Sequence, residues 1–170
     1  MSSDKKKYIV TSITLGLIAA SSGLLIGLSN LITSERIVQN EIERVNKGIK
    51  SIFGEEAIIS KEYDLSGYQY VKYVYEVSNV DNLIGYAFKT SGSNMYGKIS
   101  LLVGYNASLE FSNISVVTNE QTYASTLVDN YVIPVQEGVR DIDDVTCGAT
   151  YGAKLIRDMI KEASEVVKEL

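Results

Sequence analysis

The sequence predicts an α+β protein: an N-terminal transmembrane helix, then a small domain in which helices flank an antiparallel sheet. Three observations support this class. Residues 8–32 contain no charged side chain, the central part has short runs rich in Tyr, Val and Ile, and the C-terminal part has apolar residues at helical spacing. At 170 residues and 45% apolar content, the chain has room for one modest domain plus an accessory segment.

The apolar run at residues 8–32 predicts a membrane anchor, because a helix of this length covers about 37 Å and can cross a bilayer. Lys5, Lys6 and Lys7 precede it, so residues 1–7 are predicted to form a cytoplasmic tail and the rest of the chain to lie outside. A cleaved signal peptide is the alternative. It is less favoured because the run is longer than a typical signal core and Ala19-Ala20-Ser21 is a poor cleavage site.

Small residues recur within this span at spacings of three and four, at Gly16, Ala20, Gly23 and Gly27. In a helix they form one stripe, which lets another membrane helix approach closely. The stripe predicts other membrane subunits as partners. The alternative is that Gly and Ala are simply frequent in membrane helices.

Residues 33–54 are predicted to form an amphipathic helix that links the anchor to the domain and packs on the sheet. Its apolar stripe consists of Val38, Ile42, Val45, Ile49 and Ile52. Gly54 is a typical helix stop. A coiled coil is less favoured, since the repeat is too short to sustain one.

Residues 55–170 are predicted to form the extracytoplasmic domain. Strands are expected at residues 68–77, 84–90, 99–105 and 109–118, with a turn at Asn106-Ala107-Ser108. Strands that follow one another through short connections form antiparallel sheets. A final helix is predicted from apolar residues at helical spacing, which are Leu155, Ile156, Met159, Ile160, Ala163, Val166, Val167 and Leu170.

Composition excludes several classes of chemistry. The chain has no histidine, which removes the commonest general base and metal ligand. Its single cysteine excludes an internal disulfide and a four-cysteine cluster. The net charge is −5 although the first seven residues are basic, and an acidic domain argues against nucleic acid as a partner. Two possibilities remain: chemistry supplied by a bound cofactor, without a resident metal, or no chemistry at all.

The start of the final helix carries the strongest motif, Asp144-Val145-Thr146-Cys147-Gly148-Ala149-Thr150. Gly and Ala let a bulky ligand approach the backbone, and the Thr150 hydroxyl is expected beside unpaired helix N–H groups. These groups and the helix dipole favour a phosphate. The alternative is that Thr150 is an ordinary helix N-cap.

These residues resemble the flavinylation motif of the FMN-binding domain family: Asp, two variable residues, Ser or Thr, then Gly-Ala-Thr before a helix. The resemblance implies that Thr150 carries FMN through a phosphoester, and that Asp144, Cys147, Gly148 and Ala149 belong to the signature read by a flavin transferase. Cys147 stands where the family has Ser or Thr.

The segments at residues 83–89, 96–105 and 114–117 are similar to the strands that precede the motif in this family. A loop that approaches the flavin follows them there. The segment Glu120-Gln121-Thr122-Tyr123-Ala124 takes its place here, so the resemblance implies Gln121, Thr122 and Tyr123 as further cofactor-binding residues.

Tyrosine is the main candidate for stacking on a flavin ring, because the chain has 12 tyrosines and no tryptophan. Five lie near segments that the family places around the flavin, and one or two of them are expected to touch it: Tyr86, Tyr96, Tyr105, Tyr123 and Tyr151. Cys147 is expected to pack in a tight turn, with a redox role beside the flavin as the alternative.

The resemblance implies an electron-transfer subunit with covalent FMN in a membrane ion-translocating oxidoreductase, either of the Rnf type or of the sodium-pumping NADH:quinone reductase type. Its partners would be other membrane subunits and a flavin transferase. Two alternatives stay open: an anchored, non-enzymatic assembly or pilin-like protein, and a solitary extracellular flavoprotein reductase with loosely held FMN.

Overall fold

The computed structural model describes residues 3–65, 67–80, 82–139, 142 and 147–169. The chain divides into two units, Met1–Ile42 and Glu43–Leu170, which are described separately. Helix α1 (Ser3–Phe53) begins in the first unit and ends in the second.

The first unit is helical throughout its described part. Its α1 residues are long and apolar enough, by length and composition, to cross a membrane. Large apolar side chains such as Leu17, Leu25 and Ile26 are exposed, and apart from the adjacent helix backbone and chain neighbours, no described residue lies within 4 Å of a Cβ added at Gly16 or Gly23. A signal sequence has the same properties, so membrane crossing remains a prediction.

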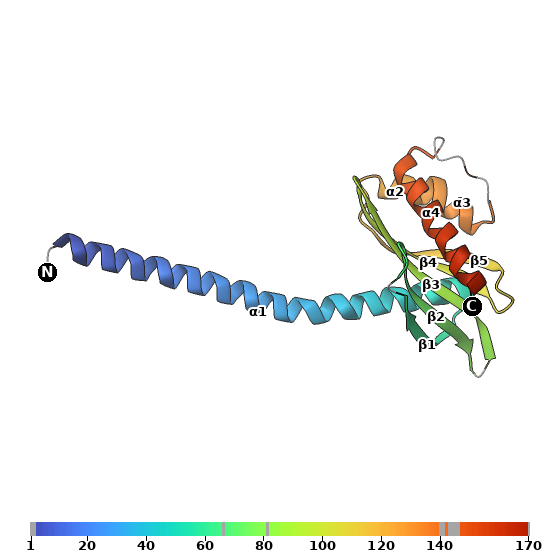
Figure 1. Cartoon of the computed structure of the whole chain (residues 1–170), viewed down its shortest axis with the longest axis horizontal. Coiled ribbons are helices and arrows are strands. Elements are labelled where there is room, and N and C mark those ends of the chain that lie inside the picture. Colours follow the sequence, from blue (N-terminus) through green and yellow to red (C-terminus); the bar gives the residue numbers. More distant parts are fainter. Residues whose placement is uncertain (1–2, 66, 81, 140–141, 143–146, 170) are drawn as a thin grey trace. The chain divides into compact units, whose positions relative to one another are not determined.

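The second unit contains a five-stranded antiparallel sheet in the order β1-β2-β3-β4-β5 (Figure 1). The strands are β1 (Ile58–Asp64), β2 (Val71–Asn79), β3 (Asn82–Asn94), β4 (Gly97–Asn106) and β5 (Phe111–Asn119). The helical elements that follow are α2 (Ala124–Leu127), a π-helical turn (Val128–Val132), α3 (Ile133–Gln136), α4 (Thr150–Val166) and a 3₁₀ turn (Val167–Glu169). The α+β class and the antiparallel sheet are confirmed.

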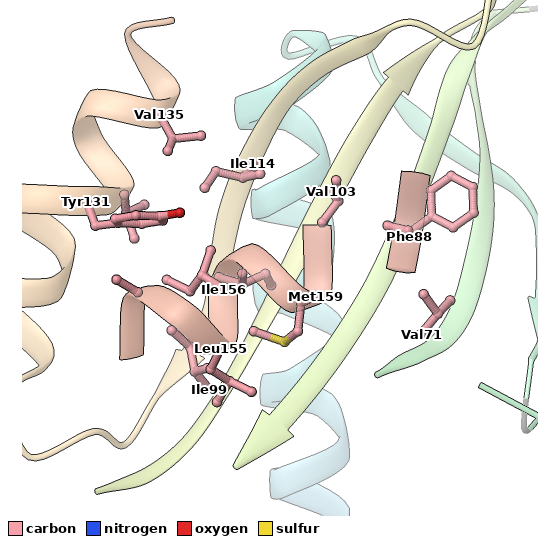
Figure 2. Packing of buried hydrophobic residues seen from close by; sticks show 14 of the residues in the cluster. Val71, Phe88, Ile99, Val103, Ile114, Tyr131, Val135, Leu155, Ile156 and Met159 are labelled. Carbon is pink, nitrogen blue, oxygen red and sulfur yellow. The ribbon is translucent and has the colours of Figure 1, made fainter. Parts of the chain in front are cut away.

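Helices cover both faces of the sheet, and β4 is buried on both. Val103 of β4 faces α4, where it packs with Ile156 and Met159 (Figure 2). Leu101 belongs to the same cluster. Leu102 faces the opposite way and packs with the end of α1. This alternation follows from the two-residue period of a strand, and it explains why β4 reads as an almost continuous apolar run.

The part of α1 that belongs to the second unit packs on the sheet as predicted. Val45 and Ile49 are buried and Ile52 is half-buried, in a cluster with side chains of β2, β3 and β4. Val38 and Ile42 of the same predicted stripe belong to the first unit, where they are 57% and 54% exposed.

The four predicted strands correspond to β2 through β5, with shifted ends. β3 extends to Asn94, and β5 begins only at Phe111 because Leu109 lies in the preceding turn with φ of 63°. The predicted turn is present: the Asn106 side-chain oxygen accepts hydrogen bonds from the N–H groups of Ser108 (2.9 Å) and Glu110 (3.0 Å).

Two parts of the second unit were not predicted. The first is β1, an edge strand whose residues are almost all exposed, with charged side chains among them. The second is the helical stretch α2 to α3, which packs Leu127, Val132 and Val135 against the α4 side of the sheet. The stretch contributes part of the candidate site described below.

The carboxylate of Glu162 in α4 holds the segment that leads into β2. It accepts hydrogen bonds from the backbone N–H groups of Gln69 (2.8 Å), Tyr70 (2.6 Å) and Val71 (2.7 Å). We expect Glu162→Gln to destabilise the domain by about 3 kcal/mol, because an amide offers one acceptor oxygen where three N–H groups converge on a carboxylate. Urea unfolding of the full chain in detergent, followed by circular dichroism, measures this as a lower midpoint.

Glu165→Gln is the matched control on the same helix. Glu165 is exposed, and we expect its replacement to change the unfolding free energy by less than about 0.5 kcal/mol. Equal midpoints for the two variants would contradict the role given to the Glu162 carboxylate.

Candidate functional site

Helix α4 begins at the predicted motif without a side-chain cap. Gly148 has φ of +74°, a conformation that favours glycine, and it turns the chain toward the helix. Ala149 occupies the N-cap position and makes no side-chain cap bond. Thr150 is the first helical residue, so the alternative that it is an ordinary N-cap is wrong. The N–H groups of this turn therefore have no partner within the helix and none from a side chain of the described residues.

The turn between β3 and β4 is tied to the start of α4. The Asn94 side chain accepts a hydrogen bond from the Tyr96 N–H (2.8 Å) and donates one to the Tyr151 carbonyl (3.1 Å). The Tyr96 ring lies beside the Tyr151 ring, with 5.5 Å between centroids. Asn94 thus fixes the strand turn and the helix start relative to each other.

The segment after β5 is tied to the same turn. The Tyr96 carbonyl accepts hydrogen bonds from the backbone N–H (2.8 Å) and the hydroxyl (3.2 Å) of Thr122. The Gln121 side-chain amide donates to the Gly97 carbonyl. Gly97 has φ of +131°, and a Cβ there would lie 2.1 Å from the Glu120 carbonyl oxygen, so only glycine permits this close approach.

These three segments enclose an open pocket of about 250 Å³. Its lining residues come from the β3–β4 turn, from the segment that enters α2, and from the start of α4. They are Tyr96, Gln121, Tyr123, Leu127, Gly148, Ala149, Thr150, Tyr151 and Gly152. None of these described lining residues carries a charge.

Three tyrosine rings dominate one wall of the pocket. The Tyr96 ring is 5.7 Å from that of Tyr123, with an interplanar angle of 61°, and meets the Tyr151 ring at 46°. Tyr123 and Tyr151 are 53% and 57% exposed. Exposed aromatic faces next to a pocket offer stacking area to a planar ligand.

The other two candidate tyrosines lie outside the pocket lining. Tyr86 is half-buried against the core. Tyr105 is buried between Phe88 and Phe111, and its hydroxyl has no hydrogen-bond partner among the described residues. Burial raises the pKa of Tyr105 to about 12. Both residues are therefore core residues of the sheet.

The predicted site residues divide into two groups. Gln121, Tyr123, Gly148, Ala149 and Thr150 line the pocket. Cys147 and Thr122 do not line it.

Cys147 is 2% exposed and packs beneath the turn, where its sulfur accepts a hydrogen bond from the Ala149 N–H (3.3 Å). The backbone carbonyl of Cys147 accepts a hydrogen bond from the Asn130 side chain (3.0 Å). Thr122 is exposed and does not line the pocket. Its hydroxyl donates a hydrogen bond to the Tyr96 carbonyl. Asp144 lies outside the described residues.

Sequence reasoning missed Leu127 as a lining residue, and Asn94 and Asn130 as positioning residues. Leu127 was missed because α2 was not predicted. The two asparagines carried no distinguishing signal, since Asn is common in turns of every kind. Among the described residues, no group of three or more Cys, Asp or Glu side chains could hold a metal ion.

Comparison with models of known protein families gives no match, and comparison with curated proteins gives none either.

Proposed function

We propose that the protein is a membrane-anchored flavoprotein in which the Thr150 hydroxyl holds FMN through a phosphoester. In this proposal it serves as an electron-transfer component of an ion-translocating oxidoreductase, comparable to the flavin-carrying components of the Rnf complex or of the sodium-pumping NADH:quinone reductase. One observation carries the proposal: Thr150 opens an uncapped helix in a pocket walled by three tyrosines.

The residues of the pocket fit both ends of FMN. The first turn of α4 offers N–H groups that no described side chain caps, together with the positive end of the helix dipole, to the phosphate. No described lining residue is acidic, so nothing in the lining opposes an anion. Tyr96, Tyr123 and Tyr151 offer aromatic surface to the ring.

The chain contributes binding and positioning. FMN supplies electron transfer when it is bound. Thr150 fixes one end of the ligand, and the tyrosines and Gln121 surround the other. Asn94 and Thr122 hold the surrounding segments in place. The chain has no histidine, and the proposal requires no acid–base step from the protein.

The membrane anchor and the extracytoplasmic location belong to the same proposal. The exposed apolar part of α1 supports an anchor, and the three lysines before it support a cytoplasmic N-terminus. The stripe at Gly16, Gly23 and Gly27 supports contact with other membrane subunits. A covalent tether suits a cofactor outside the cell, where a diffusible one would be lost.

The intact mass of the protein purified from its native host tests these statements together. We expect the full chain plus one esterified FMN, and yellow fluorescence that remains with the polypeptide on a denaturing gel. Loss of all colour on denaturation would support loosely held FMN in a solitary reductase. An unmodified mass would support the non-enzymatic alternative, and a mass lacking the N-terminal residues would support a cleaved signal peptide.

A further inference from the structure

Gln121 is the most deeply buried polar side chain in the pocket lining. It is 7% exposed, and its side-chain amide nitrogen donates to the Gly97 carbonyl. Because a carbonyl can only accept, this bond fixes which end of the amide carries the nitrogen. The side-chain oxygen, Oε1, is therefore the end left for another partner.

No described residue donates a hydrogen bond to Oε1 of Gln121. This oxygen is also not sealed in the core, in contrast to the Tyr105 hydroxyl, which is the one fully buried side-chain polar atom without a partner among the described residues. Gln121 lines the pocket, so its free acceptor is available there. A nearly buried acceptor without a protein partner favours a ligand that brings a donor.

The surroundings of Oε1 restrict what that donor is. The nearby wall consists of the Tyr96 and Tyr123 rings, which suit a planar aromatic ligand. No described lining residue is acidic, so a cation would lie in the pocket without a partner of opposite charge, and an uncharged N–H group is the donor that this lining favours. The helix start at Thr150 suits a phosphate at the ligand's other end. The pocket thus offers complementary groups to two ends of one molecule: helix N–H groups to a phosphate, and the Gln121 oxygen to a ring N–H.

We propose that Gln121 Oε1 accepts a hydrogen bond from the imide N–H of an isoalloxazine ring, and that this contact sets the orientation of the ring in the pocket. The inference rests on the proposed function, because it assigns the ring end of the ligand whose phosphate Thr150 would hold. Gln121 is then a specificity-determining residue, and its bond to Gly97 holds the acceptor in position.

The acid dissociation of the flavin imide tests this contact without any activity measurement. The probe is the flavinylated full chain in detergent, titrated to alkaline pH while flavin absorption is recorded, with free FMN as reference. A hydrogen bond from the imide N–H stabilises its protonated form. We expect the imide of the native protein to lose its proton about tenfold less readily than free FMN, and this difference to disappear in Gln121→Met.

Thr122→Val is the matched control, since it removes another tie between the same loop and Tyr96 without touching the Gln121 oxygen. It should keep the native titration. If the imide of the flavin in the unsubstituted protein titrated like that of free FMN, the inference would be overturned while FMN attachment stood. This comparison does not depend on the folding of any variant. A native titration in Gln121→Met would also overturn it. A native-host protein without attached flavin would overturn the proposed function as well.

Discussion

Thr150→Val should abolish covalent flavin attachment completely while the fold remains intact. Valine has the shape of threonine but no hydroxyl to form the phosphoester. Thr150 is exposed and its hydroxyl makes no hydrogen bond with any described residue, so we expect a stability change within about 0.5 kcal/mol. In-gel flavin fluorescence and intact mass, measured on protein made together with a flavin transferase, give the result directly.

Two variants make the Thr150 experiment specific. Thr150→Ser keeps a hydroxyl at the same position and should retain attached FMN, at least in part. Thr122→Val removes the hydroxyl of a threonine that borders the pocket but does not line it, and should leave the flavin in place. Attached FMN in Thr150→Val at the native level would refute the assignment of this residue.

Gly97→Ala should destabilise the domain by at least about 4 kcal/mol and should remove the contact between Gln121 and the flavin ring. The added Cβ would lie 2.1 Å from the Glu120 carbonyl oxygen, and both groups belong to backbone that other bonds hold in place. Relieving the collision would separate β4 from the segment that carries Gln121. Urea unfolding of the full chain measures the first effect, and the alkaline titration of the flavin imide measures the second.

Gly54→Ala separates backbone strain from collision. Gly54 also has a positive φ, of +102°, but a Cβ there meets nothing within 4 Å. Its replacement should cost only the strain of that conformation, about 1–2 kcal/mol. If Gly54→Ala and Gly97→Ala lost equal stability, the close approach of Gly97 to Glu120 would not be what constrains this position.

The sequence predicted those strands of the sheet whose side chains are largely buried. β4 is buried without interruption from Ile99 to Tyr105, β3 buries Ala87, Phe88 and Thr90 beside it, and both strands were located correctly. β1 was missed because an edge strand with almost no buried side chain has little apolar patterning to detect. The stretch α2 to α3 was missed because two four-residue helices around a π-helical turn are too short for a helical period to stand out.

The candidate site was predictable in part because the motif is local in sequence. Gly148, Ala149 and Thr150 adjoin one another, and their place before α4 followed from the helical pattern behind them. The convergence of Tyr96 and Tyr123 on the same helix start depends on the β3–β4 turn and on the chain after β5. The spacing of residues along the sequence does not reveal contacts between such distant segments. Five tyrosines were therefore candidates from the sequence, of which three line the pocket.

The end of α1 completes the core of the second unit, and this determines how a water-soluble piece of the protein can be made. Val45 and Ile49 cover Leu102 and Val77 on the sheet face opposite α4. A fragment cut at residue 55, where the sequence placed the domain boundary, would leave that apolar face bare and prone to aggregation. A fragment that begins just before Val45 keeps the last turns of α1, which cover this face, and still lacks the apolar run at residues 8–32.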